Sequence, residues 1–181
     1  MAQTPADAIA LQQQGRLAES AVAWHAVTQR NPNDAAAFGA WGSVLSQEAK
    51  YEEAAAAYEK GLLLNPKLPG IQLNLGVAQF KLGHFAQALA PLRAALAADP
   101  HSVQARTLLG LSLYGARRFQ QAVAQLKPIA DRDPDNTELH RVLAQTCLWA
   151  KDSCALEEYR RILQQNPDSP SVHPFGRVVF I

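Results

Sequence analysis

The chain has 181 residues, enough for one ordinary domain or for a short stack of repeats. Its 17 Lys and Arg residues nearly balance 16 Asp and Glu residues, and a net charge of +1 provides no electrostatic footprint for nucleic acid or an anionic membrane. A hydrophobic content of 48% argues against disorder, and only two cysteines exclude a disulfide-framework mini-protein and a four-cysteine zinc ribbon.

A pair formed by Asn or Asp followed by Pro recurs along the chain. The prolines of successive pairs are 34, 34, 34 and 33 residues apart. Because the residue before a proline is pushed out of the helical conformation, each pair predicts the end of a helix. The pairs are Asn31-Pro32, Asn65-Pro66, Asp99-Pro100, Asp133-Pro134 and Asn166-Pro167.

The apolar pattern between these stops is helical and divides each unit into two helices. In the third unit, Leu75, Ala78 and Leu82 share one face of a first helix, and a second helix follows Phe85. Gly83 lies between them and permits the left-handed backbone of a tight turn. The sequence therefore predicts helix–turn–helix units at 1–34, 35–68, 69–102, 103–136 and 137–169, followed by an incomplete sixth unit or tail at 170–181.

Short polar side chains precede several first helices, where they suit the N-cap position. A Ser, Thr, Asp or Asn side chain there accepts a hydrogen bond from a backbone N–H group that the helix leaves unpaired. The expected caps are Thr4, Asp34, Ser102 and Asn136.

The repeated residues resemble those of tetratricopeptide repeats, in which an aromatic residue, Leu-Gly, Tyr, Ala, an aromatic residue and Pro recur over 34 residues. The resemblance covers nearly the whole chain and is closest in the three middle units. The second unit carries Phe38, Trp41-Gly42, Leu45, Tyr51, Ala54, Tyr58 and Pro66; the third carries Leu75-Gly76, Gly83, Phe85, Ala88, Leu92, Ala95 and Pro100; and the fourth carries Leu109-Gly110, Leu113, Phe119, Ala122, Leu126 and Pro134.

Close packing explains the small residues of this pattern. Gly42, Gly76, Gly110 and Ala144 fall where the two helices of a unit approach, and a larger side chain would push the helices apart. A lone unit cannot bury both of its faces, so we expect stability to come from stacking.

The resemblance implies an all-α solenoid with a right-handed superhelical twist, whose first helices line a concave groove that binds a peptide or a helix of a partner protein. Helical spacing turns Gly39, Ser46, Leu148 and Trp149 toward this groove, together with the residues that we expect to contact the partner. These are Ser43, Gln47, Leu73, Asn74, Val77, Phe80, Lys81, Thr107, Leu111, Tyr114, Arg141 and Gln145. Packing between first helices is the alternative role for Phe80, Leu111 and Tyr114.

Some family members bind the carboxylate at the end of a chaperone through Lys, Asn and Arg residues on successive first helices. Asn74 matches one of those positions, but Gly39, Ser43, Gln104 and Leu108 occupy the positions around it. Because the cations are missing, we expect a neutral groove that takes an apolar or mixed segment.

The sequence contains no motif of a catalytic centre, such as a phosphate-binding glycine loop, His-Glu-x-x-His, a serine elbow or Cys-x-x-Cys. We therefore expect no enzymatic activity, no cofactor and no metal site. His140, Cys147 and Cys154 are spaced by sevens but would lack a fourth metal ligand. Cys147 and Cys154 straddle a shortened turn, where they either form a disulfide or remain two buried thiols. Two basic pairs, Arg117-Arg118 and Arg160-Arg161, are balanced by Glu157, Glu158 and the run of Asp131, Asp133 and Asp135, so we expect them on a solvated helix surface and not at a phosphate site.

The expected function is a non-catalytic scaffold that binds a partner protein, without nucleic acid and without insertion into a membrane. One alternative is the regulatory or substrate-recruiting part of a larger enzyme. Another is a homo-oligomerisation module, in which the apolar end of the segment 170–181 forms a homodimer. Because the first residues pass straight into a capped helix, we expect no signal peptide in this chain, and both a cytoplasmic and a periplasmic location stay open.

Overall fold

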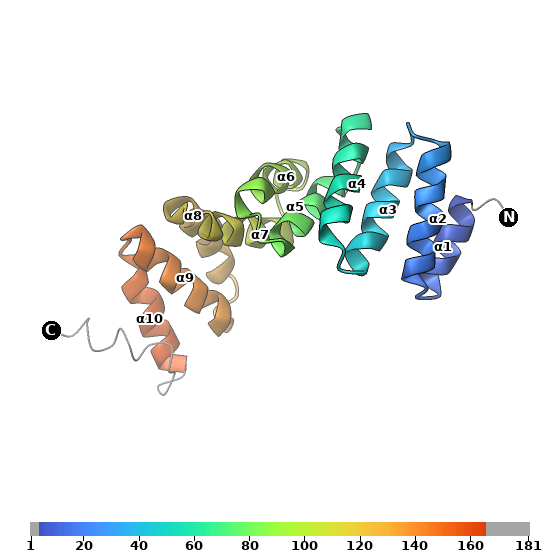
Figure 1. The fold of residues 1–181 in the computed structure, drawn as a ribbon. Coiled ribbons are helices and arrows are strands. Elements are labelled where there is room, and N and C mark those ends of the chain that lie inside the picture. The colour runs from blue at the N-terminus through green and yellow to red at the C-terminus, as the bar shows by residue number, and fades with distance from the viewer. Residues whose placement is uncertain (1–3, 166–181) are drawn as a thin grey trace. The chain divides into compact units, whose positions relative to one another are not determined.

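A computed structural model describes residues 4–165 of the protein. Within this range the chain forms ten α-helices and no strand, so the predicted all-α fold is confirmed (Figure 1). The segment 170–181, with the dimer predicted for it, lies outside the described residues. The helices are α1 (Pro5–Gln13), α2 (Leu17–Arg30), α3 (Ala35–Gln47), α4 (Tyr51–Leu64), α5 (Ile71–Lys81), α6 (Phe85–Ala98), α7 (Val103–Gly115), α8 (Phe119–Ala130), α9 (Thr137–Ala150) and α10 (Cys154–Gln165).

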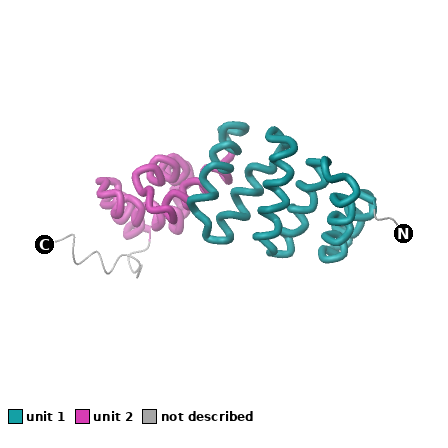
Figure 2. Tube along the Cα trace, turned by 45° about the horizontal axis from the view of Figure 1, so that its top comes forward, with its two compact units in different colours: residues 1–101 teal, residues 102–181 magenta. Residues whose placement is uncertain are grey.

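Successive helices pair into hairpins, and each hairpin falls inside one of the predicted units. The chain divides into two compact units, which comprise residues 1–101 and 102–181 (Figure 2). Helices α1 to α6 belong to the first compact unit, and α7 to α10 belong to the second compact unit. Within each unit, every helix packs mainly against the helices that precede and follow it in the chain.

The ends of the helices follow the predicted signals. The side chains of Thr4, Asp34, Ser102 and Asn136 each accept a hydrogen bond from a backbone N–H group in the first turn of the following helix, so the predicted caps are confirmed. The residues before three of the prolines are the C-caps of second helices: Asn31 of α2, Asn65 of α4 and Asp99 of α6.

The turns inside the five hairpins share one backbone feature. Each contains a residue with positive φ, and these residues recur every 34 positions: Gly15, Ala49, Gly83, Arg117 and Lys151, with φ values of 74°, 58°, 73°, 59° and 55°. The prediction for Gly83 is confirmed. The other hairpins use the same turn even where the residue has a side chain, although the left-handed conformation is unfavourable for residues other than glycine.

Small residues on the first helices allow close contact with the second helices. A Cβ atom at Gly42 would lie 2.6 Å from the Tyr58 ring, and one at Gly76 would lie 2.5 Å from Leu92. A Cβ atom at Gly110 would meet Leu126 at the same distance of 2.5 Å. These contacts agree with the packing role predicted for the glycines.

The last described hairpin, α9–α10, is joined by two further contacts. The Sγ atoms of Cys147 and Cys154 form a disulfide across the turn. Farther along the helices, His140 Nδ1 lies 2.5 Å from Glu158 Oε2, and both side chains are buried. The expectation that Glu158 belongs to a solvated surface is therefore wrong, because Glu158 faces α9 and pairs with the imidazole.

Candidate functional site: a polar pocket between α3, α4 and α5

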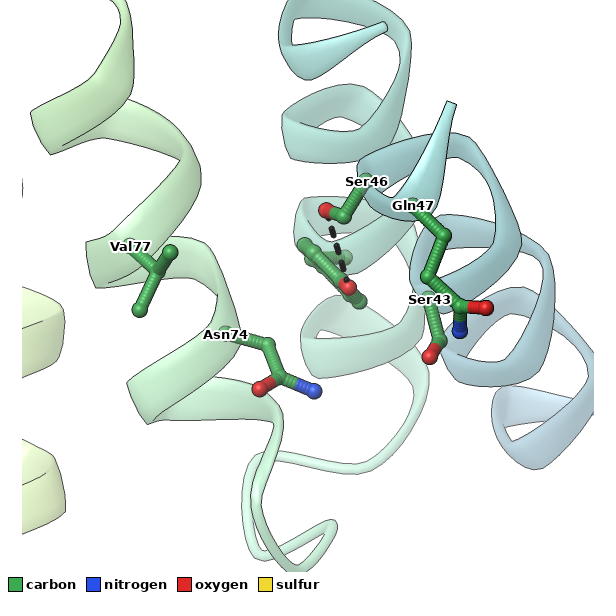
Figure 3. A pocket seen from close by; sticks show the side chains of 6 residues that line it. Ser43, Ser46, Gln47, Asn74 and Val77 are labelled. Atoms are coloured by element: carbon green, nitrogen blue, oxygen red, sulfur yellow. Dashed lines mark hydrogen bonds between the residues drawn. The ribbon is translucent and has the colours of Figure 1, made fainter. Parts of the chain in front are cut away.

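A pocket of about 180 Å³ lies in the first compact unit, where helices α3, α4 and α5 meet (Figure 3). Helix α3 supplies three polar side chains, and α5 supplies a polar and an apolar side chain from the opposite wall. Figure 3 shows Asn74 reaching from α5 toward the side of Ser43 and Gln47. The lining residues are Ser43, Ser46, Gln47, Tyr58, Asn74 and Val77.

One side of the pocket is fixed by a hydrogen bond between α3 and α4. The hydroxyl oxygens of Ser46 and Tyr58 are 3.2 Å apart. Tyr58 is buried, and burial raises the pKa of its hydroxyl, so the group stays protonated and neutral at physiological pH. The Tyr58 ring is held in this position because Gly42 leaves the space for it.

The other polar side chains of the pocket make no hydrogen bond with the described residues. Among residues 4–165, Ser43, Gln47 and Asn74 have no hydrogen-bonding partner for their side chains. Each of the two amides carries a donor and an acceptor, and the serine hydroxyl can act as either. None of the six described residues that line the pocket is charged. The arrangement therefore suits a neutral ligand with both donors and acceptors, and it offers no countercharge for an ion.

Four residues predicted to bind a partner, Ser43, Gln47, Asn74 and Val77, come together in this pocket. The other three predicted residues of α5 do not line it. Leu73 is half-buried, Lys81 is exposed, and the Phe80 ring packs edge-on against Phe85 with 5.7 Å between the ring centroids. The contact made by Phe80 is thus a packing contact within its own hairpin.

The remaining predicted residues belong to the second compact unit. Thr107, Leu111 and Tyr114 are half-buried on α7, and the Tyr114 ring packs edge-on against Phe119 at 5.7 Å. On α9, Gln145 is exposed, whereas Arg141 is held by its own helix. Arg141 Nε donates to Glu138 Oε2 at 2.9 Å, and this bond raises the pKa of the guanidinium and lowers that of the carboxyl.

Two residues, Gly39 and Tyr58, have roles that differ from those predicted from the sequence. Gly39, expected to face the groove, is buried, and a Cβ atom there would lie 2.7 Å from Ile71 Cδ1. Gly39 therefore serves the packing of α5 on α3. Tyr58 lines the pocket although it belongs to a second helix, where the repeat pattern indicates only packing. The signal for it was the hydroxyl itself, since the equivalent positions in the next two units are Leu92 and Leu126.

Two kinds of site are not formed by the described residues. Within residues 4–165, no group of three or more His, Cys, Asp or Glu side chains is arranged to hold a metal ion. In the same part of the chain, no helix combines the length and the apolar character needed to cross a membrane.

Two models of one repeat family match the chain. The model described as Tetratricopeptide repeat matches residues 80–146, and the model described as TPR repeat matches residues 42–83. Together they span residues 42–146, from within α3 to within α9, with the same helix–turn–helix unit that the structure shows. The chain is a tetratricopeptide repeat protein. Proteins of this family are typically non-catalytic interaction modules, and membership supports a protein-interaction role for this tetratricopeptide repeat protein.

Solved structures share the fold of this tetratricopeptide repeat protein at low sequence identity. YrrB, a TPR protein with an unusual peptide-binding site, has a TM-score of 0.80 and 21% identity over 93% of this chain and 88% of its own. MamA from Desulfovibrio magneticus RS-1 has a TM-score of 0.74 and 21% identity over 90% of this chain and 93% of its own. A search of curated protein sequences finds no match.

Proposed function

We propose that this tetratricopeptide repeat protein binds an extended segment of a partner protein, and that the pocket between α3, α4 and α5 holds part of its backbone. The observation that carries the proposal is the set of three unpartnered polar side chains, Ser43, Gln47 and Asn74, around one cavity. A peptide group presents one donor and one acceptor, which is what an Asn or Gln amide can pair with.

The walls of the pocket suit the same ligand. Val77 provides an apolar surface beside the amides, and the Ser46–Tyr58 pair fixes the opposite side. Because no lining side chain is charged, the pocket has no means of selecting a carboxylate or an ammonium group. We therefore expect a segment whose neutral residues lie in the pocket. The fold neighbour YrrB, which has a peptide-binding site, supports a peptide as the class of ligand.

The test is a screen of the full chain against a random peptide array, followed by fluorescence anisotropy with the peptides that bind. Replacing Asn74 or Gln47 by Ala should weaken binding about fivefold for each lost hydrogen bond, which corresponds to about 1 kcal/mol. Gln13→Ala and Gln164→Ala are matched controls, because they remove exposed amides from α1 and α10. Equal losses in the pocket variants and the controls, or no loss in the pocket variants, would contradict the proposal.

A further inference from the structure

A row of aromatic rings crosses the second compact unit at the end where its hairpins turn. The Phe119 ring, at the start of α8, stacks on Trp149 near the end of α9, with 6.1 Å between centroids and 23° between the ring planes. The Tyr114 ring packs edge-on against Phe119, with 5.7 Å between the centroids. Trp149 nevertheless remains 56% exposed, and its neighbour Leu148 is 38% exposed. An exposed indole supported by a second ring is a surface feature that needs an explanation.

Three cations lie in the two turns that flank these rings. Arg117 and Arg118 join α7 to α8, and Lys151 follows Trp149 at the end of α9. All three are exposed, and none has an ion-pair partner among residues 4–165. The same turns contain one carboxylate, Asp152, whose Oδ1 accepts the Cys154 N–H at 3.0 Å.

In the first compact unit, the basic residues of the equivalent hairpin turns have local partners. A basic residue precedes each second helix there, where Arg16 is paired with Glu19 at 2.5 Å and Lys50 with Glu48 at 3.3 Å. His84 Nδ1 lies 3.1 Å from Gln79 Oε1. Local partners therefore bind the basic groups in these turns of the first compact unit, whereas the three cations beside the aromatic row make no ion pair with residues 4–165.

The aromatic row is also held in place. Gln120 Nε2 donates to the Ala150 backbone oxygen at 2.6 Å, which ties the start of α8 to the end of α9. The disulfide between Cys147 and Cys154 closes the turn that carries Lys151. A surface that is already ordered loses little conformational entropy when a ligand binds.

We propose that Tyr114, Phe119, Trp149, Arg117, Arg118 and Lys151 form a second docking surface, the aromatic–basic face, which binds an acidic protein segment containing an aromatic or aliphatic side chain. The apolar side chain packs on the exposed indole, and the flanking carboxylates pair with the three cations. Aromatic and Arg residues are the usual energetic centres of protein interfaces, and charge complementarity selects the partner. The aromatic–basic face lies in the second compact unit, and it shares no residue with the pocket of the first compact unit.

An acidic peptide is favoured over nucleic acid because the aromatic–basic face contains only three cations, all of them in two turns. The chain as a whole has a net charge of +1, whereas nucleic-acid binding relies on an extended basic surface. Single-stranded DNA is nevertheless an informative probe, since it too combines negative charge with groups that stack on aromatic rings.

The experiment measures fluorescence anisotropy of the full chain with labelled peptide pools. One pool has Phe, Trp or Leu flanked by Asp and Glu, a second replaces the acids with Lys, and a third replaces the central residue with Ser. Oligo(dT) is the fourth probe. The acidic apolar pool should bind, and the other two pools should bind at least about tenfold more weakly. Equal binding of the Lys pool, no binding of the acidic apolar pool, or tighter binding of oligo(dT) would overturn the proposal.

Variants separate binding from folding. Trp149→Ala should weaken the acidic pool about tenfold, whereas Leu63→Ala, which removes a 76% exposed side chain of α4, should have no effect. The double variant Arg117→Gly and Lys151→Gly separates the two effects more sharply. Both residues have positive φ, so glycine should stabilise the fold. Because the variant also removes two cations, it should weaken binding of the acidic pool about tenfold.

Two controls complete the design. Ala49→Gly relieves the same backbone conformation without changing charge, and it should leave the affinity unchanged. Asn74→Ala, in the pocket, should also leave the acidic pool unaffected, so the aromatic–basic face and the pocket can fail separately. Unchanged affinity in the Arg117→Gly and Lys151→Gly variant would overturn the role of the cations.

Discussion

Hairpins α3–α4 and α9–α10 have the same plan, but their helices are held together by different means. In α3–α4, Gly42 leaves room for the Tyr58 ring, which is only 1% exposed. In α9–α10 the corresponding small residue is Ala144, and Tyr159 remains half-buried beside it. A disulfide and the buried His140–Glu158 pair join these two helices instead. The lack of a Cβ methyl group at Gly42 thus permits a buried ring in α3–α4, whereas α9–α10, which has alanine at that position, is joined by the disulfide and the buried pair.

The buried pair gives the largest expected effect. Removing one partner leaves the other charge or donor buried without compensation, because Glu158 is 1% and His140 is 0% exposed. Glu158→Ala should therefore lower the free energy of unfolding by about 3–5 kcal/mol, as measured by urea denaturation. Replacing both residues by apolar ones should cost less than the sum of the single changes. A loss below about 1 kcal/mol for Glu158→Ala would show that the pair contributes little.

The disulfide gives the next effect. It closes a short loop, since Cys147 and Cys154 are separated by 7 positions in the sequence. Its reduction should lower the free energy of unfolding by about 2 kcal/mol, which urea denaturation with and without a reductant would measure. The Cys147→Ala and Cys154→Ala double variant is the control and should not respond to reductant. Two free thiols in the denatured, unreduced protein would contradict the bond.

The glycine contact of α3–α4 can be tested by adding one methyl group. In Gly42→Ala the new Cβ atom would lie 2.6 Å from the Tyr58 ring, and the resulting overpacking should destabilise the protein by about 1–3 kcal/mol. Alanine favours a helix over glycine by about 1 kcal/mol, so the sign of the change reports on packing. Stabilisation on thermal denaturation would show that the ring moves aside freely.

The hairpin turns give the smallest effect. Gly83→Ala should destabilise the protein by about 1 kcal/mol, and Ala49→Gly should stabilise it by up to about 1 kcal/mol, because both positions have positive φ. A Cβ atom at Gly83 would meet nothing within 4 Å, so conformation alone accounts for the difference. Chemical denaturation of the two variants should give changes of opposite sign, and changes of equal sign would contradict this explanation.

The fold followed from the sequence because its signals are local and repeated. Proline spacing, N-cap residues such as Ser102 and the glycine at position 83 each act on the backbone within a few residues. The division between residues 101 and 102 was not visible, since the period is 34 residues on both sides of it. Four residues of the pocket were among those expected to bind, because helical spacing determines which side chains share a face.

Contacts between helices were harder to predict. The repeat pattern predicts only a packing role for Tyr58, and the hydrogen bond between its hydroxyl and that of Ser46 is visible only in the structure. Glu158 lies among charged residues in the sequence, yet it is buried because α10 turns that position toward His140. The aromatic–basic face depends on the approach of Phe119 to Trp149, which are 30 positions apart. Such pairs require the geometry of two helices, which no local pattern specifies.

The pairing of each helix with its neighbours in the chain has a consequence for how the protein folds. Contacts in each unit join residues that are close in sequence, so little loop entropy is lost when they form. Proteins with such low contact order fold in about microseconds to milliseconds. A hairpin can also serve as a nucleus wherever it forms first, and growth then proceeds by adding one helix at a time.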